Sequence, residues 1–96
     1  PGLDGISLGR NDLSGSLGKL GQHKDPEVLR AIDTVLEKAR KTDIHVGAST
    51  GFDPDLVKEW WEKGVQWFAL GEDMGHMADG FEKVVTGTRA IGANRT

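Results

Sequence analysis

Short apolar segments alternate with longer amphipathic segments along the 96 residues. Three of the short segments, residues 4–9, 44–49 and 65–71, have the composition of β-strands. The first strand is predicted to place Ile6 and Leu8 on one face. The polar stretch 10–24 is rich in Gly and Ser and is predicted to be mainly loop, with a few helical turns.

The longer segments have the spacing and the boundary signals of helices. Asp25 and Asp53 each combine an N-cap side chain with a following proline, which suits the first helical position. The first helix is predicted to run to about residue 41, and Gly64 is predicted to end the second. A third helix is predicted to start near Asp73 and to carry an apolar stripe from residue 74 to 88.

The resulting β-α-β-α-β-α order predicts an α/β fold with parallel strands joined by right-handed crossovers. Three parallel strands alone leave both sheet edges and one face uncovered, whereas parallel sheets are normally buried on both faces. A closed (β/α)₈ TIM barrel takes about 250 residues, so 96 residues at this unit length correspond to three of its eight units. Residues 1–96 are therefore predicted to be a single segment of a larger barrel domain.

Composition excludes several other classes of protein. The net charge is −3, from 15 acidic and 12 basic residues with no basic run, which argues against nucleic acid as the main partner. The longest apolar run is four residues, at 67–70, so no membrane span of about 20 residues is expected. The chain lacks cysteine and shows no signal peptide, which predicts a cytoplasmic protein without disulfides or thiolate metal sites.

Candidate chemistry is expected where the strands end, because active sites of such barrels lie at the carboxyl ends of the strands. Residues 9–14, 47–50 and 71–73 follow the three predicted strands. The Asp12 carboxylate suits a hard divalent cation, and the N–H groups of residues 11–14 can hold an anionic group. The alternative is that Asp12 only caps a short helical turn.

The other polar residues carry weaker signals, and no histidine is assigned to catalysis. His45 lies inside a strand and is predicted to be a packing residue, His23 to be exposed in a polar loop, and His76 to lie in the first turn of the last helix. Glu72 and Asp73 are candidates for the mouth of the site. For Asp73 the alternative is that it caps the last helix.

One family accounts for several of these residues together. Residues 2–14, the Leu-Gly pair at 17–18 and residues 25–28 closely resemble the HpcH/HpaI aldolase/citrate lyase family, in particular its class II aldolases of 2-keto-3-deoxy sugar acids. Residues 65–73 are similar to the eighth strand of that family. The resemblance therefore implies that the chain forms the last three βα units of a (β/α)₈ TIM barrel.

The resemblance also implies an activity. Such enzymes are metal-dependent carbon–carbon lyases that cleave 4-hydroxy-2-keto acids to pyruvate and an aldehyde through a metal-bound pyruvate enolate, and they run the reverse addition. Asp12 matches the metal-ligand aspartate, with Mg²⁺ (or Mn²⁺ or Co²⁺) as the cation. The N–H groups of Asn11 and Asp12 match those that hold the pyruvate carboxylate, and Ser49 matches a position lining the substrate pocket.

Part of the family's machinery has no counterpart in this sequence. The second metal ligand, a glutamate, the histidine associated with the base, and the enolate-stabilising arginine all come from earlier strands. No catalytic residue is therefore expected within this segment, and the segment alone is expected to be inactive. The family's proline after Gly9 is replaced by Arg10, which adds a positive charge near the substrate.

Other interpretations of the function stay open at this point. A macrophomate-synthase-like enzyme or an acyl-CoA lyase belongs to the same superfamily, and a non-catalytic partial-barrel scaffold is a different class. Members of the family tend to form hexamers in which the last helix is swapped between neighbours. The apolar stripe from Met74 to Thr88 is compatible with such a homo-oligomer, and equally with packing on the same barrel.

Overall fold

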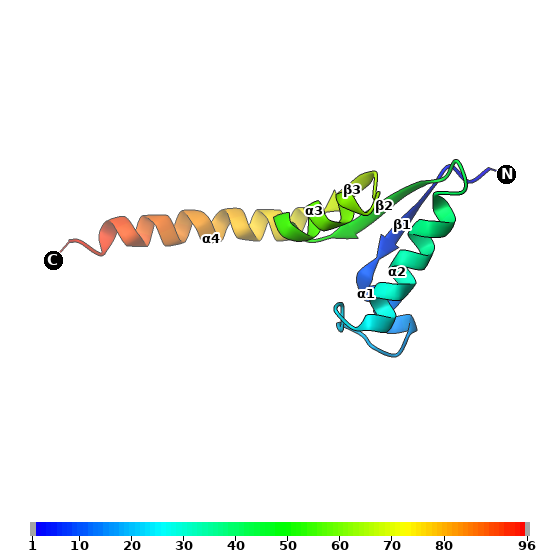
Figure 1. The fold of residues 1–96 in the computed structure, drawn as a ribbon. Helices are drawn as coiled ribbons and strands as arrows, with labels where there is room; N and C mark the ends of the chain where they lie inside the picture. The colour runs from blue at the N-terminus through cyan, green and yellow to red at the C-terminus, as the bar shows by residue number, and fades with distance from the viewer. Residues whose placement is uncertain (1, 96) are drawn as a thin grey trace.

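The computed structural model describes residues 2–95, which form three parallel strands and four helices. The sheet has the order β1-β2-β3, and the alternation of strands and helices predicted from the sequence is confirmed (Figure 1). The elements are β1 (Gly5–Gly9), α1 (Arg10–Ser16), α2 (Pro26–Ala39), β2 (His45–Thr50), α3 (Pro54–Glu62), β3 (Trp67–Leu70) and α4 (Asp73–Gly92).

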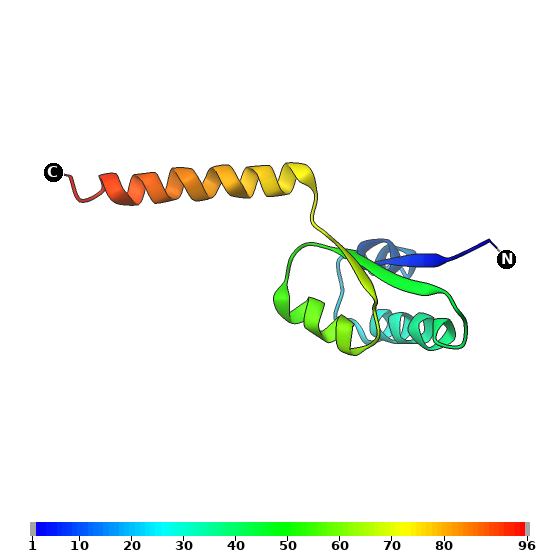
Figure 2. The same cartoon turned by 90° about the horizontal axis from the view of Figure 1, so that it is seen from above.

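The register of the strands separates an apolar face of the sheet from a polar one. Ile6 pairs with Val46 and Leu8 with Ala48, so these apolar side chains share one face, as predicted for the first strand. Helices α2 and α3 both lie on that side of the sheet (Figure 2). Phe68 of β3 lies in register with Ala48 and packs against the same core.

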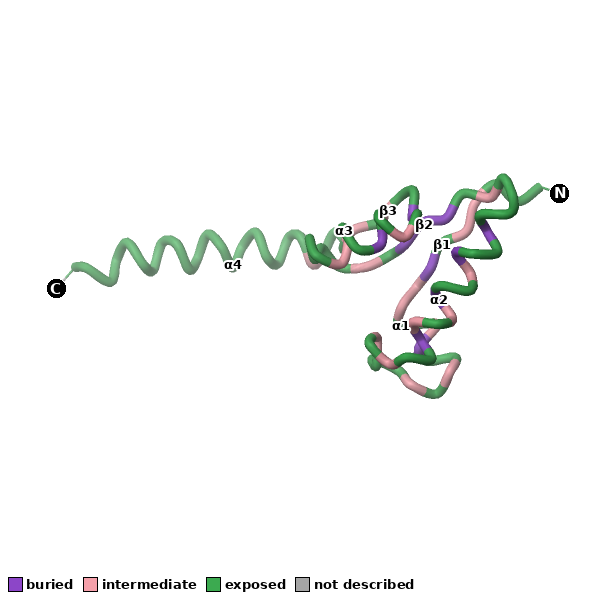
Figure 3. The backbone as a smooth tube through the Cα atoms, in the orientation of Figure 1, coloured by how far each residue is buried: buried purple, intermediate pink, exposed green. Residues whose placement is uncertain are grey.

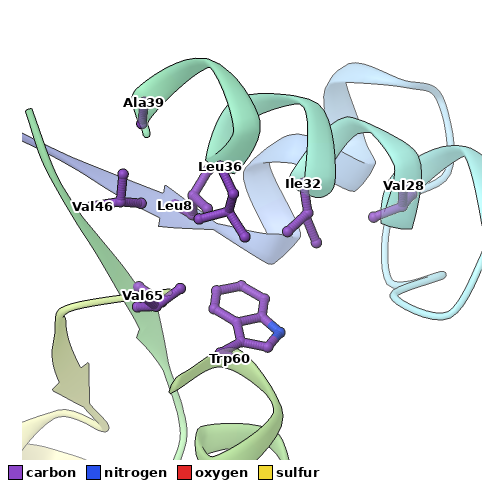
Figure 4. Packing of buried hydrophobic residues seen from close by; sticks show 9 residues of the cluster. Leu8, Val28, Ile32, Leu36, Ala39, Val46, Trp60 and Val65 are labelled. Carbon is purple, nitrogen blue, oxygen red and sulfur yellow. The ribbon is translucent and has the colours of Figure 1, made fainter. Parts of the chain in front are cut away.

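The core lies between this apolar face and the two helices (Figure 4). Val28 and Ile32 of α2 are almost fully buried because they recur at helical spacing, and Trp60 of α3 is 2% exposed. Burying each such side chain contributes about 1.5–3 kcal/mol. The complete set of buried apolar residues is Leu8, Val28, Ile32, Leu36, Ala39, Val46, Ala48, Trp60 and Val65.

The helix boundaries follow the signals in the sequence. Asp25 Oδ1 accepts a hydrogen bond from Glu27 N at 2.8 Å, which caps α2. Asp53 caps α3 in the same way. Gly64 follows the C-cap of α3 with φ of 99°, a left-handed conformation that favours glycine, so the predicted helix stop is confirmed.

The helical turns expected within residues 10–24 form α1, which starts directly after β1. Its Asn, Ser and Gly content disfavours a helix interior, but tertiary contacts override that preference. Leu13 packs against the core, and the Ser14 side chain is fully buried. The remaining residues, 17–24, form turns.

The second face of the sheet carries small and polar residues, and within residues 2–95 no helix covers it. Trp67 is the largest side chain on this face within residues 2–95, and its indole lies over Gly47 of the neighbouring strand β2. A Cβ atom on Gly47 would lie 2.0 Å from Trp67 Cε2, so a glycine is required there. Ser49 lies on the same face, one layer nearer to the carboxyl ends of the strands.

Helix α4 extends away from the rest of the chain (Figures 1 and 3). The chain measures 65 × 28 × 22 Å, with a radius of gyration of 18.3 Å against the ~12–13 Å of a compact domain of this length. The apolar residues of α4, including Met74 and Phe81, are exposed. No helix within residues 2–95 is long and apolar enough to cross a membrane.

We predict that Gly47→Ala destabilises the protein by about 1–3 kcal/mol, because the added methyl group displaces the Trp67 indole. Gly51→Ala is the matched control, since a Cβ atom there meets nothing within 4 Å. Urea denaturation of both variants measures the difference. Equal stability of the two variants would contradict the placement of Trp67.

Candidate functional site

The carboxyl ends of β1 and β2 border a hollow of about 300 Å³, here called the strand-end hollow. Parallel strands place these ends at one edge of the sheet, so segments distant in sequence meet there. Asn11, Asp12 and Ser49, the three residues expected to bind ligands, all line it. Its full lining is Gly9, Arg10, Asn11, Asp12, His23, Ser49, Thr50 and Gly51.

Asp12 lies in the first turn of α1 and is exposed. Its carboxylate turns back over the end of β1, since a Cβ atom on Gly9 would lie 2.7 Å from Asp12 Oδ2. The N-cap residue of α1 is Gly9, with no side-chain cap, so the alternative in which Asp12 caps the turn is not supported. The carboxylate accepts no hydrogen bond from residues 2–95, which leaves both oxygens available to a cation.

His23 is not simply exposed, as predicted, but half-buried against the hollow. Its Nε2 lies 2.5 Å from Asn11 Oδ1. The pair joins the loop before α2 to the start of α1. No periodicity or motif links positions twelve apart in a polar loop, so the sequence held no signal for this contact.

Arg10 occupies the first position of α1. The N–H of the first helical position has no acceptor within the helix, so proline and arginine both fit there. Arg10 in place of the family's proline therefore leaves the helix start intact. Arg10 Nη2 donates a hydrogen bond to Thr50 Oγ1 at 3.0 Å, which ties the end of β1 to the end of β2. The guanidinium forms no ion pair with the acidic groups among residues 2–95, so its charge is unbalanced at the rim.

The loop that carries His23 is fixed at two points. The buried Ser14 Oγ donates to Asn11 O at 3.0 Å and accepts from Gly21 N at 3.2 Å. Lys19 Nζ bridges Asp25 Oδ1 at 2.9 Å and Glu27 Oε2 at 3.0 Å. The hydrogen bond from Lys19 lowers the pKa of Asp25, and the same contact raises the pKa of Lys19.

His45 was predicted to be a packing residue, and in this structure it is exposed. It starts β2 on the face that no described helix covers, which explains the error. Its Nδ1 lies 3.3 Å from Asp4 O.

The end of β3 lies outside the strand-end hollow. His76 Nε2 is 2.8 Å from Leu70 O, in the first turns of α4. Glu72, not Asp73, holds the N-cap position of α4, and Asp73 Oδ1 accepts from Met74 N at 2.8 Å. Glu72 and His76 instead line a separate hollow of about 570 Å³.

The candidate metal ligand is a single carboxylate. Within residues 2–95, no three His, Cys, Asp or Glu side chains lie close enough together to hold a metal ion. The described chain therefore supplies one carboxylate at the strand ends, together with main-chain N–H groups, an amide and hydroxyl groups around the same hollow.

The family model of HpcH/HpaI aldolase/citrate lyase matches residues 1–80. The chain belongs to the HpcH/HpaI aldolase/citrate lyase family. It is 34% identical over 89 residues to a 5-keto-4-deoxy-D-glucarate aldolase of Klebsiella pneumoniae, a match that covers 85% of this chain and 34% of the relative. A protein of the same name from Enterobacter sp. strain 638 gives the same figures. The chain thus spans about a third of the length of these curated relatives.

Solved structures share the fold of this chain. An HpcH/HpaI aldolase/citrate lyase family protein from Burkholderia cenocepacia superposes with a TM-score of 0.83 at 27% identity, over 93% of this chain and 34% of that one. The citrate synthase SbnG gives a TM-score of 0.79 at 29% identity, over 97% of this chain and 38% of that one. The α/β arrangement of parallel strands and helices is therefore that of the family.

We predict that Lys19→Met raises the pKa of Asp25 toward its ordinary value of 3.8, because the largest contribution to its lowered pKa is removed. In the native protein this contact stabilises the fold above about pH 3.8, and the stabilisation is lost as the pH falls through the lowered pKa of Asp25. NMR titration of the Asp25 carboxyl carbon measures both.

Lys41→Met is the control, since Lys41 pairs with the exposed Glu37, at 3.6 Å, and with no other acidic residue among residues 2–95. This variant is expected to leave the pKa of Asp25 unchanged. An Asp25 pKa that stays the same in Lys19→Met would show that Lys19 does not hold the loop in solution.

Proposed function

We propose that the 96 residues form the last three βα units of an eight-unit TIM barrel, as a single segment of that domain. The length supports this, since the chain spans about a third of its relatives. The sheet supports it too, because a parallel sheet with one bare face and two open edges requires further strands and helices to cover it.

We infer that the whole protein is a divalent-metal aldolase that cleaves 4-hydroxy-2-keto acids to pyruvate and an aldehyde. The observation that carries this proposal is the free Asp12 carboxylate at the strand-end hollow, folded over Gly9. The relatives named 5-keto-4-deoxy-D-glucarate aldolase support the reaction class.

The residues of the hollow fit one corner of a metal site. Asp12 is a hard oxygen donor of the kind that Mg²⁺, Mn²⁺ and Co²⁺ accept, and the remaining protein ligands are proposed to come from the rest of the barrel. When bound, the cation stabilises the negative charge that develops on the keto oxygen of the substrate. Residues 1–96 alone are accordingly proposed to be inactive.

The other residues of the hollow are proposed to bind the organic part of the substrate. The main-chain N–H groups of Asn11 and Asp12 lie in the first turn of α1, where intrahelical acceptors are lacking, and are proposed to hold the carboxylate of the 2-keto acid. Ser49 is exposed on the polar face of β2 and is proposed to line the aldehyde side. Arg10 adds positive charge at the rim.

A second candidate is a condensing enzyme, and the similarity to the citrate synthase SbnG favours it. Aldol cleavage and condensation share the need to stabilise an enolate, so the strand-end hollow serves either. Cleavage consumes a 4-hydroxy-2-keto acid, whereas condensation joins an enolate to a second carbonyl compound. An assay of the products distinguishes the two reactions.

We also propose that the whole protein is a homo-oligomer, a hexamer with swapped carboxyl-terminal helices. Helix α4 carries exposed apolar residues. The exposed fraction is 59% for Met77 and 65% for Val84. No residue of α4 (Asp73–Gly92) is buried, and an exposed apolar surface of this kind is typical of an interface.

The full-length protein with Mg²⁺, Mn²⁺ or Co²⁺ is expected to release pyruvate from a 4-hydroxy-2-keto acid. A lactate dehydrogenase-coupled assay measures the pyruvate, and addition of EDTA is expected to stop its release. A full-length protein without metal-stimulated turnover would contradict the aldolase proposal.

Asp12→Asn is expected to lower metal affinity and turnover by more than about 100-fold, since even partners of metal ligands contribute 10–100-fold. Asp43→Asn is the matched control, because Asp43 is exposed and precedes β2 at the opposite end of the sheet. Isothermal titration with Mn²⁺ and the pyruvate assay measure both variants. Wild-type metal affinity in Asp12→Asn would contradict the ligand role.

A further inference from the structure

The contact between His23 and Asn11 is not used by the function proposed above. His23 Nε2 lies 2.5 Å from Asn11 Oδ1, and both residues line the strand-end hollow. The contact joins two segments that are otherwise linked through Ser14, whose buried hydroxyl donates to Asn11 O and accepts from Gly21 N. The placement of His23 is therefore determined by the fold of the loop.

The hydrogen bond fixes the direction of the Asn11 amide. The amide has one acceptor oxygen and one NH₂ group on opposite branches, so a donor that holds Oδ1 leaves Nδ2 on the other side. Asn11 Nδ2 has no hydrogen-bond partner among residues 2–95. Two N–H donors are thus left at the border of the hollow, next to the Asp12 carboxylate in sequence.

The same contact fixes the chemistry of the histidine. With Asn11 Oδ1, which only accepts hydrogen bonds, as its partner, His23 Nε2 takes the role of the donor. The role of His23 in this arrangement is to orient the amide rather than to transfer a proton.

We propose that His23 is a positioning residue, which orients Asn11 so that its side-chain Nδ2 donates a hydrogen bond to a carboxylate oxygen of the 2-keto acid. This inference rests on the proposed function, since it specifies a further contact of the same substrate. It adds a side-chain donor beside the main-chain N–H groups of Asn11 and Asp12. A hydrogen bond to a charged group strengthens binding about tenfold or more.

The test compares variants of the full-length, Mg²⁺-loaded protein, with pyruvate as the probe. His23→Ala and Asn11→Ala are each expected to raise the Kd for pyruvate, and its KM in the reverse addition to an aldehyde, about tenfold. The kcat of that addition is expected to change little, because the contact serves binding alone. The double variant is expected to lose no more than either single one, since both remove the same hydrogen bond.

The conservative variant separates positioning from packing. The Nε2 group of a glutamine can donate where His23 Nε2 does, so His23→Gln is expected to restore pyruvate affinity to within about threefold of the native protein. Gln22→Ala, next to it in the same loop and exposed, is the control and is expected to bind pyruvate normally. Circular dichroism and urea denaturation establish that each variant is folded.

The outcomes distinguish this inference from the aldolase proposal. Native protein that binds pyruvate without cleaving a 4-hydroxy-2-keto acid would overturn the aldolase proposal, and a weaker Kd in His23→Ala would still support the role of His23. An active enzyme whose pyruvate KM and Kd are unchanged in folded His23→Ala would overturn the inference alone. Additive losses in the double variant, or a His23→Gln variant as weak as His23→Ala, would also overturn it.

Discussion

Parallel pairing of the strands is the constraint on which the rest of this structure depends. It places the carboxyl ends of β1 and β2 at one edge, with Gly9 opposite Ser49 in the register. Residues that are nearly forty positions apart therefore border one hollow. This arrangement brings Asp12 and Ser49 to the same hollow as the contact between His23 and Asn11.

Much of the fold was predictable because it depends on local signals. The Asp-Pro starts of α2 and α3, the stop at Gly64 and the apolar stripe of α2 act within a few residues, and the structure has them where they were expected. The position of α1 was not predictable, because the buried Ser14 and the packing of Leu13 are tertiary contacts that outweigh poor helix propensity. His23 was missed for a similar reason, since its partner lies on another element.

The two faces of the sheet differ in how far the described residues cover them. One face is closed by Ile32, Trp60 and their neighbours, and it forms a core of its own. Within residues 2–95, the other face is covered only by the Trp67 indole lying on Gly47, and Ser49 is exposed on that face. We propose that further strands of the whole protein supply the partners of the Asp12 carboxylate, since no three His, Cys, Asp or Glu side chains within residues 2–95 could hold a metal ion and the chain spans about a third of its relatives.

The central claim is that Asp12 holds a divalent cation at the strand-end hollow of the complete protein. The most direct measurement is the position of Mn²⁺, from its anomalous scattering, in crystals of the full-length protein grown with pyruvate. We expect one Mn²⁺ within about 2.5 Å of an Asp12 carboxylate oxygen, with the pyruvate carboxylate near the N–H groups of Asn11 and Asp12. A Mn²⁺ ion bound elsewhere, with Asp12 free of metal, would contradict it.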